Sequence, residues 1–169
     1  MADYWSDKTV FAHAGHLEVA SVTYEVTADF SKPLPQAFIL VVTLRALGVF
    51  LGSTTVSPIA DGPVTLDVAQ PFGGQIKGQI SNWGAVDSAG KPIPATDTTW
   101  SDASIVSFLI TAMGNVALPV SAIVGLVPGL GWIAKAAIGF LGSSVSVNIG
   151  HKSIALPIHR DSSGKPTQP

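Results

Sequence analysis

The chain of 169 residues contains no cysteine and few charged side chains. The absence of cysteine excludes a disulfide framework, a thiol nucleophile and a cysteine-ligated metal. Charged residues make up 12% of the chain, against about 25% in ordinary soluble domains. The net charge of −2 and the pI near 6.0 provide no basic surface for the phosphates of a nucleic acid. We therefore predict that the protein does not bind nucleic acid.

The N-terminus also lacks the features of a secretory signal peptide. Residues 1–8 hold two acidic side chains and no apolar run. This pattern is compatible with a protein that stays in the cytoplasm, one that is exported by a non-classical route, or one that has lost its leader. The sequence alone leaves the compartment open.

Apolar residues are abundant, at 47% of the chain, which excludes intrinsic disorder and supplies a folded core. Alternating and continuous apolar patterns, separated by turn residues, predict a series of β-strands. The strands are expected at 17–29, 38–47, 49–56, 64–68, 75–83, 145–149 and 154–158. The fold class that follows is α+β and mainly β, an antiparallel β-barrel or sandwich of seven to eight strands.

Three local patterns refine this prediction. The alternation in 17–29 changes phase near Ala20 and Ser21, which indicates a β-bulge. Residues 150–153 are expected to join the last two strands as a hairpin. We predict one β-rich domain over residues 1–160, followed by a flexible polar tail over 161–169.

The segment 103–142 differs from the rest because residues 103–151 carry one formal charge, Lys135. Ser101 and Asp102 offer a helix N-cap, and Pro119 should end or kink the helix that follows. Helical spacing joins the apolar residues Ile105, Phe108, Leu109, Ala112, Met113 and Val116. A second short helix is expected over 132–141, stopped by Gly142. The segment is thus predicted to be an inserted hydrophobic helical hairpin.

Three interpretations of this hairpin stay open, and they are not mutually exclusive. It could be buried against the sheet, since a helix that is apolar all round is usually buried. It could contact a membrane, because residues 103–125 carry no charge over a length that spans a bilayer. It could also meet copies of itself at an oligomer interface.

We expect the apolar segment to hold the functional residues. Tryptophan side chains favour the boundary between water and lipid, and Lys135 would set the depth of contact. The residues predicted to contact a membrane or an apolar ligand are Phe108, Leu109, Met113, Trp132, Lys135 and Phe140.

The densest set of potential metal ligands is His13 and His16 with Glu18 nearby. Imidazole and carboxylate groups bind transition metals. On a strand, however, positions 13 and 16 face opposite sides, and no third histidine is close in sequence. We therefore expect two exposed turn histidines and predict neither a metal site nor a cofactor.

Catalytic motifs are absent: the sequence contains no G-x-S-x-G and no phosphate-binding glycine loop. Arg45 is unusual because it interrupts an apolar strand, where an unpaired charge is costly. It should pair with Asp67 or Glu25, or line a polar cavity. If the fold is a barrel, Arg45, Glu25 and Tyr24 would form a polar site in the lumen.

These patterns lead to three functional hypotheses. The first is a non-enzymatic protein that contacts membrane lipid or an apolar molecule through the 103–142 segment. The second is a self-assembling structural homo-oligomer, because low charge suits packing against identical copies. The third is a small barrel enzyme or binder that takes an apolar small molecule into its lumen.

Overall fold

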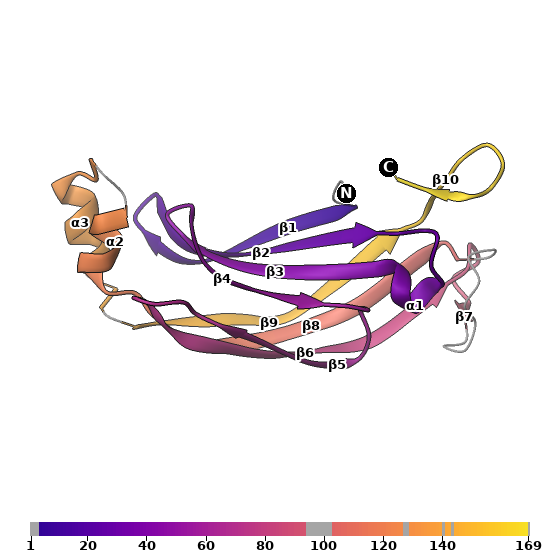
Figure 1. Cartoon of the computed structure of the whole chain (residues 1–169), viewed down its shortest axis with the longest axis horizontal. Coiled ribbons are helices and arrows are strands. Elements are labelled where there is room, and N and C mark those ends of the chain that lie inside the picture. The colour runs from indigo at the N-terminus through magenta and orange to yellow at the C-terminus, as the bar shows by residue number, and fades with distance from the viewer. Residues whose placement is uncertain (1–3, 94–102, 127–128, 140, 143, 169) are drawn as a thin grey trace.

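The computed structural model describes residues 4–93, 103–126, 129–139, 141–142 and 144–168. Two antiparallel sheets lie face to face along the length of an elongated molecule (Figure 1). They are not closed into a barrel. The first sheet has the order β1-β2-β3-β4, with β1 (Trp5–Ala14), β2 (Leu17–Ala28), β3 (Phe38–Ala46) and β4 (Val49–Val56). The second has the order β5-β6-β8-β9, with β5 (Gly62–Asp67), β6 (Gly73–Val86), β8 (Ile105–Ala117) and β9 (Ser144–Pro157).

Short elements complete the described chain. Helix α1 (Leu34–Ala37) leads into β3, and β7 (Pro92–Ile93) pairs with the end of β6. Strands β10 (His159–Arg160) and β11 (Pro166–Thr167) pair with each other near the C-terminus. Residues 161–168, expected to be a polar tail, thus take part in a short hairpin, and Gln168 donates a hydrogen bond to the carbonyl of Ala28.

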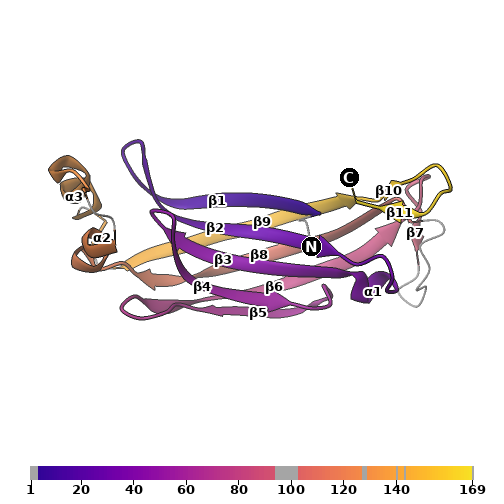
Figure 2. The ribbon, with the colours of Figure 1, turned by 45° about the horizontal axis from the view of Figure 1, so that its top comes forward.

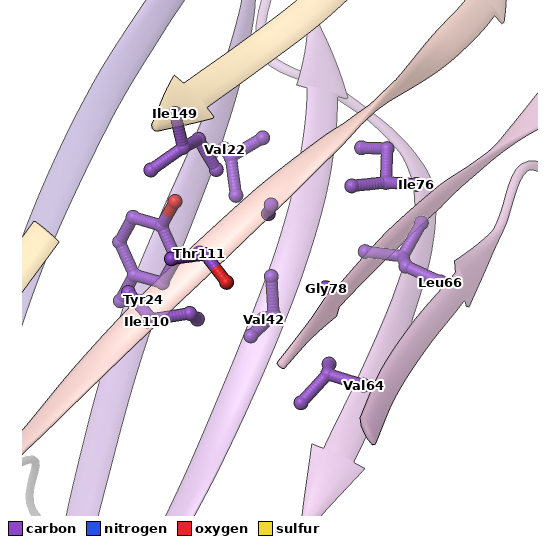
Figure 3. Close-up of a pocket in the computed structure, with 11 residues that line it drawn as sticks. Val22, Tyr24, Val42, Val64, Leu66, Ile76, Gly78, Ile110, Thr111 and Ile149 are labelled. Atoms are coloured by element: carbon purple, nitrogen blue, oxygen red, sulfur yellow. The ribbon is translucent and has the colours of Figure 1, made fainter. Parts of the chain in front are cut away.

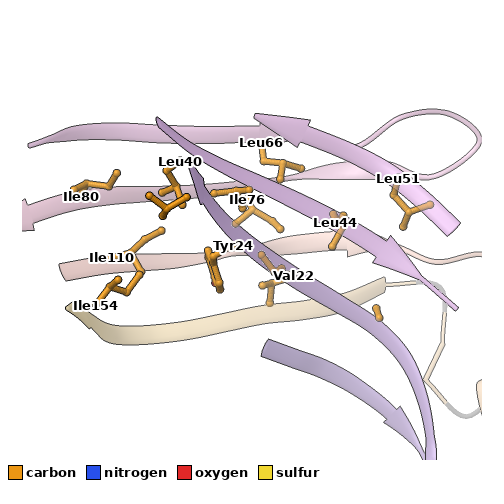
Figure 4. Packing of buried hydrophobic residues seen from close by; sticks show 14 of the residues in the cluster. Val22, Tyr24, Leu40, Leu44, Leu51, Leu66, Ile76, Ile80, Ile110 and Ile154 are labelled. Carbon is orange, nitrogen blue, oxygen red and sulfur yellow. The ribbon is translucent and has the colours of Figure 1, made fainter. Parts of the chain in front are cut away.

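The core lies between the two sheets and receives one face of each strand. In β2, Val22, Tyr24 and Val26 are fully buried, whereas Thr23 and Glu25 lie on the other face. This is the period of two that strand geometry imposes. Figure 4 shows buried side chains from both sheets meeting in this core.

The predicted phase change in β2 is confirmed. Ala12 pairs with Ala20 and His13 pairs with Glu18, so that Val19 is left without a partner in the register. The extra residue shifts the side chains after it to the opposite face. Both Val19 and Ala20 are buried as a result.

The prediction of a helix after residue 103 is wrong: β8 occupies Ile105–Ala117 and pairs with β6 and β9. Apolar residues recur in this segment at both the helical and the strand period, so spacing alone favours neither. Val106 and Ile110, which the helical stripe leaves out, are fully buried in the strand. The expected N-cap at 101–102 lies outside the described residues.

The helical part of the segment is limited to α2 (Val120–Leu126) and α3 (Trp132–Gly139), which we call the helical cap. Pro119 precedes α2 and its carbonyl accepts hydrogen bonds from the amides of Ala122 and Ile123. Proline therefore begins this helix rather than ending one, because a first-turn position needs no amide hydrogen. Within the described chain, no helix is long and apolar enough to cross a membrane.

The prediction of a hairpin at 150–153 is also wrong, because β9 is one strand of 14 residues. Met113 pairs with Asn148 and Ala112 pairs with Gly150, so Ile149 forms a bulge. Gly150 has a φ of 63°, a conformation that glycine adopts without strain. Gly150, which was expected in a turn between two strands, therefore lies beside a bulge within one strand.

Candidate functional site

Large apolar side chains are exposed at one end of the molecule. Trp132 is 77% exposed and Ile133 is 67% exposed, and both belong to α3. Phe50, the second residue of β4, is 58% exposed. Strand β4 begins at the end that carries the two helices (Figure 2). Three large apolar side chains therefore face solvent toward this end.

We call this region the helical end. It comprises the helical cap and the three turns at the same end of the sheets (Figures 1 and 2). The turns lie between β1 and β2, between β3 and β4, and between β5 and β6. By residue, the helical end consists of 13–18, 45–50, 67–74, 120–126, 129–139 and 141–142.

The helical cap is attached by its inner side. Ile123 of α2 and Ile138 of α3 are both buried, and α3 contacts both α2 and β1. The amide of Leu141 donates to the carbonyl of Ile138, and Gly142 has a φ of 75°, as residues that follow a helix often do. Burial of one side of the cap leaves Trp132 and Ile133 directed to solvent.

Few charges surround these apolar side chains. Lys135, one helical turn after Trp132, is exposed. Lys8 and Glu18 form an ion pair with an Nζ to Oε2 distance of 2.8 Å. The hydrogen bond and charge of Lys8, and the nearby His13, hold the pKa of Glu18 below its usual value. Asp67 accepts a hydrogen bond of 2.7 Å from the side chain of Gln75.

The predicted contact residues divide into three groups. Trp132 and Lys135 lie on the exposed side of α3. Phe108 is 2% exposed and packs in the core, with its ring centroid 6.5 Å from that of Trp83. Leu109 is half-buried and Met113 is exposed, both on the outer face of the second sheet. Phe140 lies outside the described residues.

The three residues predicted for a polar lumen site are not brought together. Tyr24 points into the core, whereas Glu25 lies on the outer face of the first sheet. Arg45 lies on that outer face too and donates a hydrogen bond of 2.9 Å to Thr23. The ion pairs among the described residues do not include Arg45.

A small cavity adjoins Tyr24 between the two sheets. Its volume is about 20 Å³, and its lining includes Tyr24, Val42, Leu66 and Thr111 (Figure 3). A cavity of this size has room for about one water molecule. Burial raises the pKa of Tyr24 to about 12. The cavity is thus a space far smaller than a lipid or a drug-sized ligand, and its lining includes the two hydroxyl-bearing residues Tyr24 and Thr111.

The two histidines considered as metal ligands lie at the helical end. His13 is the penultimate residue of β1 and His16 lies in the turn that follows; both are exposed. In the part of the chain that the structure describes, no cluster of three or more metal-ligating side chains is present.

Sequence reasoning placed Trp132 and Lys135 in the site and missed Ile133 and Phe50. Ile133 follows Trp132 directly, but the helical spacing gave no means to tell which side of the helix would be buried. Phe50 lies in the predicted strand 49–56. The sequence did not indicate that the turn before this strand lies at the same end of the molecule as the helices. Comparison with protein-family models, with curated protein sequences and with solved structures finds no match.

Proposed function

We propose that the protein associates with the surface of a lipid bilayer through its helical end. The observation that carries this proposal is the exposure of Trp132 and Ile133 at consecutive positions of α3. Tryptophan with a nearby lysine suits a membrane interface, because the indole is apolar with one polar N–H group and the lysine reaches the headgroups. Lys135 is one turn away on the same helix.

The energetics support a weak and reversible association. Full burial of one large aliphatic side chain contributes about 1.5–3 kcal/mol. Trp132 and Ile133 together would contribute about 3–6 kcal/mol, which corresponds to a dissociation constant between roughly several millimolar and tens of micromolar. Phe50 would add to this where it reaches the bilayer. Contact of this kind lies in the interface and requires no membrane-spanning segment.

In this proposal the two facing sheets form a β-sandwich that holds the helical cap at one end. The cap is supported by the buried Ile123 and Ile138, so its outer side can enter the headgroup region without exposing the core. The long axis of the molecule would then point away from the bilayer (Figure 1).

The test is flotation with phosphatidylcholine vesicles over a range of lipid concentration. We expect the wild type to bind and the double variant W132A/I133A to lose at least about tenfold in affinity, because it truncates two of the three large apolar side chains exposed at this end. Met113→Ala is the matched control: it truncates an equally exposed apolar side chain on the outer face of the second sheet, and its binding should equal that of the wild type.

Two outcomes would contradict the proposal: no binding of the wild type at any lipid concentration, or equal losses in W132A/I133A and Met113→Ala. Size-exclusion chromatography with light scattering on the same samples separates lipid binding from the second hypothesis, self-assembly. A monomer without lipid that floats with vesicles supports membrane association by single molecules.

A further inference from the structure

We infer that the helical end selects anionic lipid, and that acid strengthens this association through His13 and His16. The inference rests on the proposed membrane contact and adds the lipid class and its regulation. Two exposed histidines, His13 and His16, lie at the helical end, and the proposed contact by Trp132 and Ile133 gives them no role.

The two histidines lie at the same end of the molecule as Trp132 and Ile133. His13 is the penultimate residue of β1 and His16 lies in the turn between β1 and β2. Helix α3 contacts β1, and both views show this turn at the same end as the helical cap (Figures 1 and 2). A bilayer that meets Trp132 would therefore approach the end of the sheets that carries both histidines.

The other charged groups of the helical end leave a small positive surplus. Arg45 and Lys135 are the cations of the helical end, and Glu18 and Asp67 are its carboxylates. Lys8 lies outside the helical end in β1, and its ion pair with Glu18 neutralises that carboxylate. With Lys8 counted, the surplus is one positive charge, whereas the whole chain carries −2. The net charge of the helical end is therefore opposite in sign to that of the whole chain, which favours its approach to a negatively charged surface.

Protonation of the two histidines would raise this surplus to three. Histidine is the side chain that gains its charge between about pH 8 and pH 5. The nearest opposing group is Glu18, which pairs with His13 in the strand register. Because Lys8 already engages this carboxylate and lowers its pKa, Glu18 stays ionised in mild acid. It neutralises part of the new charge at His13 and leaves His16 less affected.

The test compares phosphatidylcholine vesicles with vesicles that also contain phosphatidylserine, at about pH 7.5 and about pH 5.5. We expect the wild type to prefer the anionic vesicles, with affinity rising about tenfold in acid, since each cation near an anionic surface contributes about fivefold and Glu18 offsets part of this. On neutral vesicles the pH should have little effect. Salt should weaken the acid-induced gain by screening.

The variant H13Q/H16Q should keep its affinity for neutral vesicles and lose the acid-induced gain. His151→Gln is the control, because His151 is exposed on the outer face of the second sheet and away from the helical end; it should behave as the wild type. Circular dichroism at both pH values shows whether each variant is folded.

The outcomes separate the two proposals. Binding to neutral vesicles without an acid-induced gain on anionic ones overturns this inference and leaves the membrane contact standing. An acid-induced gain that persists in H13Q/H16Q also overturns it. Failure to bind either vesicle at either pH overturns the membrane contact itself.

Discussion

Phe108 and Trp132 are large aromatic residues of the same charge-poor segment, but they occupy opposite environments. Phe108 is buried beneath the second sheet and contacts Trp83, whereas Trp132 projects into solvent from α3. The difference arises from the elements that pack against each segment. Phe108 belongs to a strand paired on both sides, so its inward face meets the other sheet. Trp132 lies on a short helix that is covered on one side only.

Substitution of Phe108 by alanine therefore tests the core. We expect Phe108→Ala to lower the free energy of unfolding by about 3–5 kcal/mol, because it leaves a cavity in a packed interior. Urea denaturation followed by circular dichroism measures this. Leu109→Ala, at the half-buried neighbouring position on the outer face, should cost clearly less. Equal effects of the two substitutions would contradict the placement of Phe108 in the core.

At the scale of elements, the main question is whether residues 105–117 form a strand or a helix. Gly114 of β8 distinguishes the two. A Cβ atom added there would lie 2.1 Å from the carbonyl oxygen of Gln75 and 2.8 Å from the Cα of Ile76 in β6. Only glycine permits this close approach of two strands. On an exposed helix the same replacement would be favourable.

The expected change in stability caused by Gly114→Ala therefore has opposite signs for a strand and for a helix at this position. We expect it to destabilise the protein by about 1–3 kcal/mol, because the added methyl group forces the strands apart. A helix would gain about 1 kcal/mol from the same change. Gly125→Ala in α2 is the control: apart from its chain neighbours and the backbone of its own helix, nothing lies within 4 Å of its added Cβ, and it should stabilise the protein slightly. Thermal unfolding of both variants gives the two signs.

The elements that sequence patterns predicted well are those with a clear alternation. The strands near 38–47 and 75–83 and the bulge in β2 are of this kind. Strand β1 was missed because Trp5–Ala14 shows no regular alternation, and only one of its residues, Ala12, is fully buried. It is an edge strand, held by its pairing with β2. A strand of this kind depends on a partner that local sequence does not reveal.

At the scale of the whole molecule, the two sheets are joined along both edges. At one edge the amide of Ala69, after β5, donates to the carbonyl of Leu51 in β4 at 2.8 Å. At the other edge Lys152 of β9 forms an ion pair with Asp7 of β1, at 2.5 Å. The Lys152 ammonium also lies 5.0 Å from the centre of the Tyr24 ring. These links fix how the second sheet sits on the first.

The link between Asp7 and Lys152 predicts a pH dependence of stability. The hydrogen bond from Lys152 lowers the pKa of Asp7 in the folded protein. A lowered folded-state pKa contributes stability above the unfolded-state value of about 3.9, and the contribution is lost as the pH falls through the folded-state pKa. We expect Asp7→Asn to lower the free energy of unfolding by about 0.2–1 kcal/mol near neutrality, because the pair is partly exposed.

The measurement is urea denaturation of the wild type and Asp7→Asn across the acid range. The difference between the two proteins should shrink as the pH falls below the usual range of a carboxyl group and vanish where Asp7 is protonated. A difference that stays constant into strong acid would show that the ion pair does not stabilise the two sheets.

The sequence by itself determined that the protein is rich in antiparallel strands, contains no cysteine, and has one segment that is almost free of charged residues. It also placed Trp132 and Lys135 in the candidate site. Only the tertiary structure decided that 105–117 is a strand, that β9 is continuous, and that Ile133 and Phe50 are exposed. The physical reason is that side-chain periodicity defines the two faces of an element but not its neighbours. Strand pairing and the meeting of the two sheets decide which apolar side chains are buried and which remain exposed at the helical end.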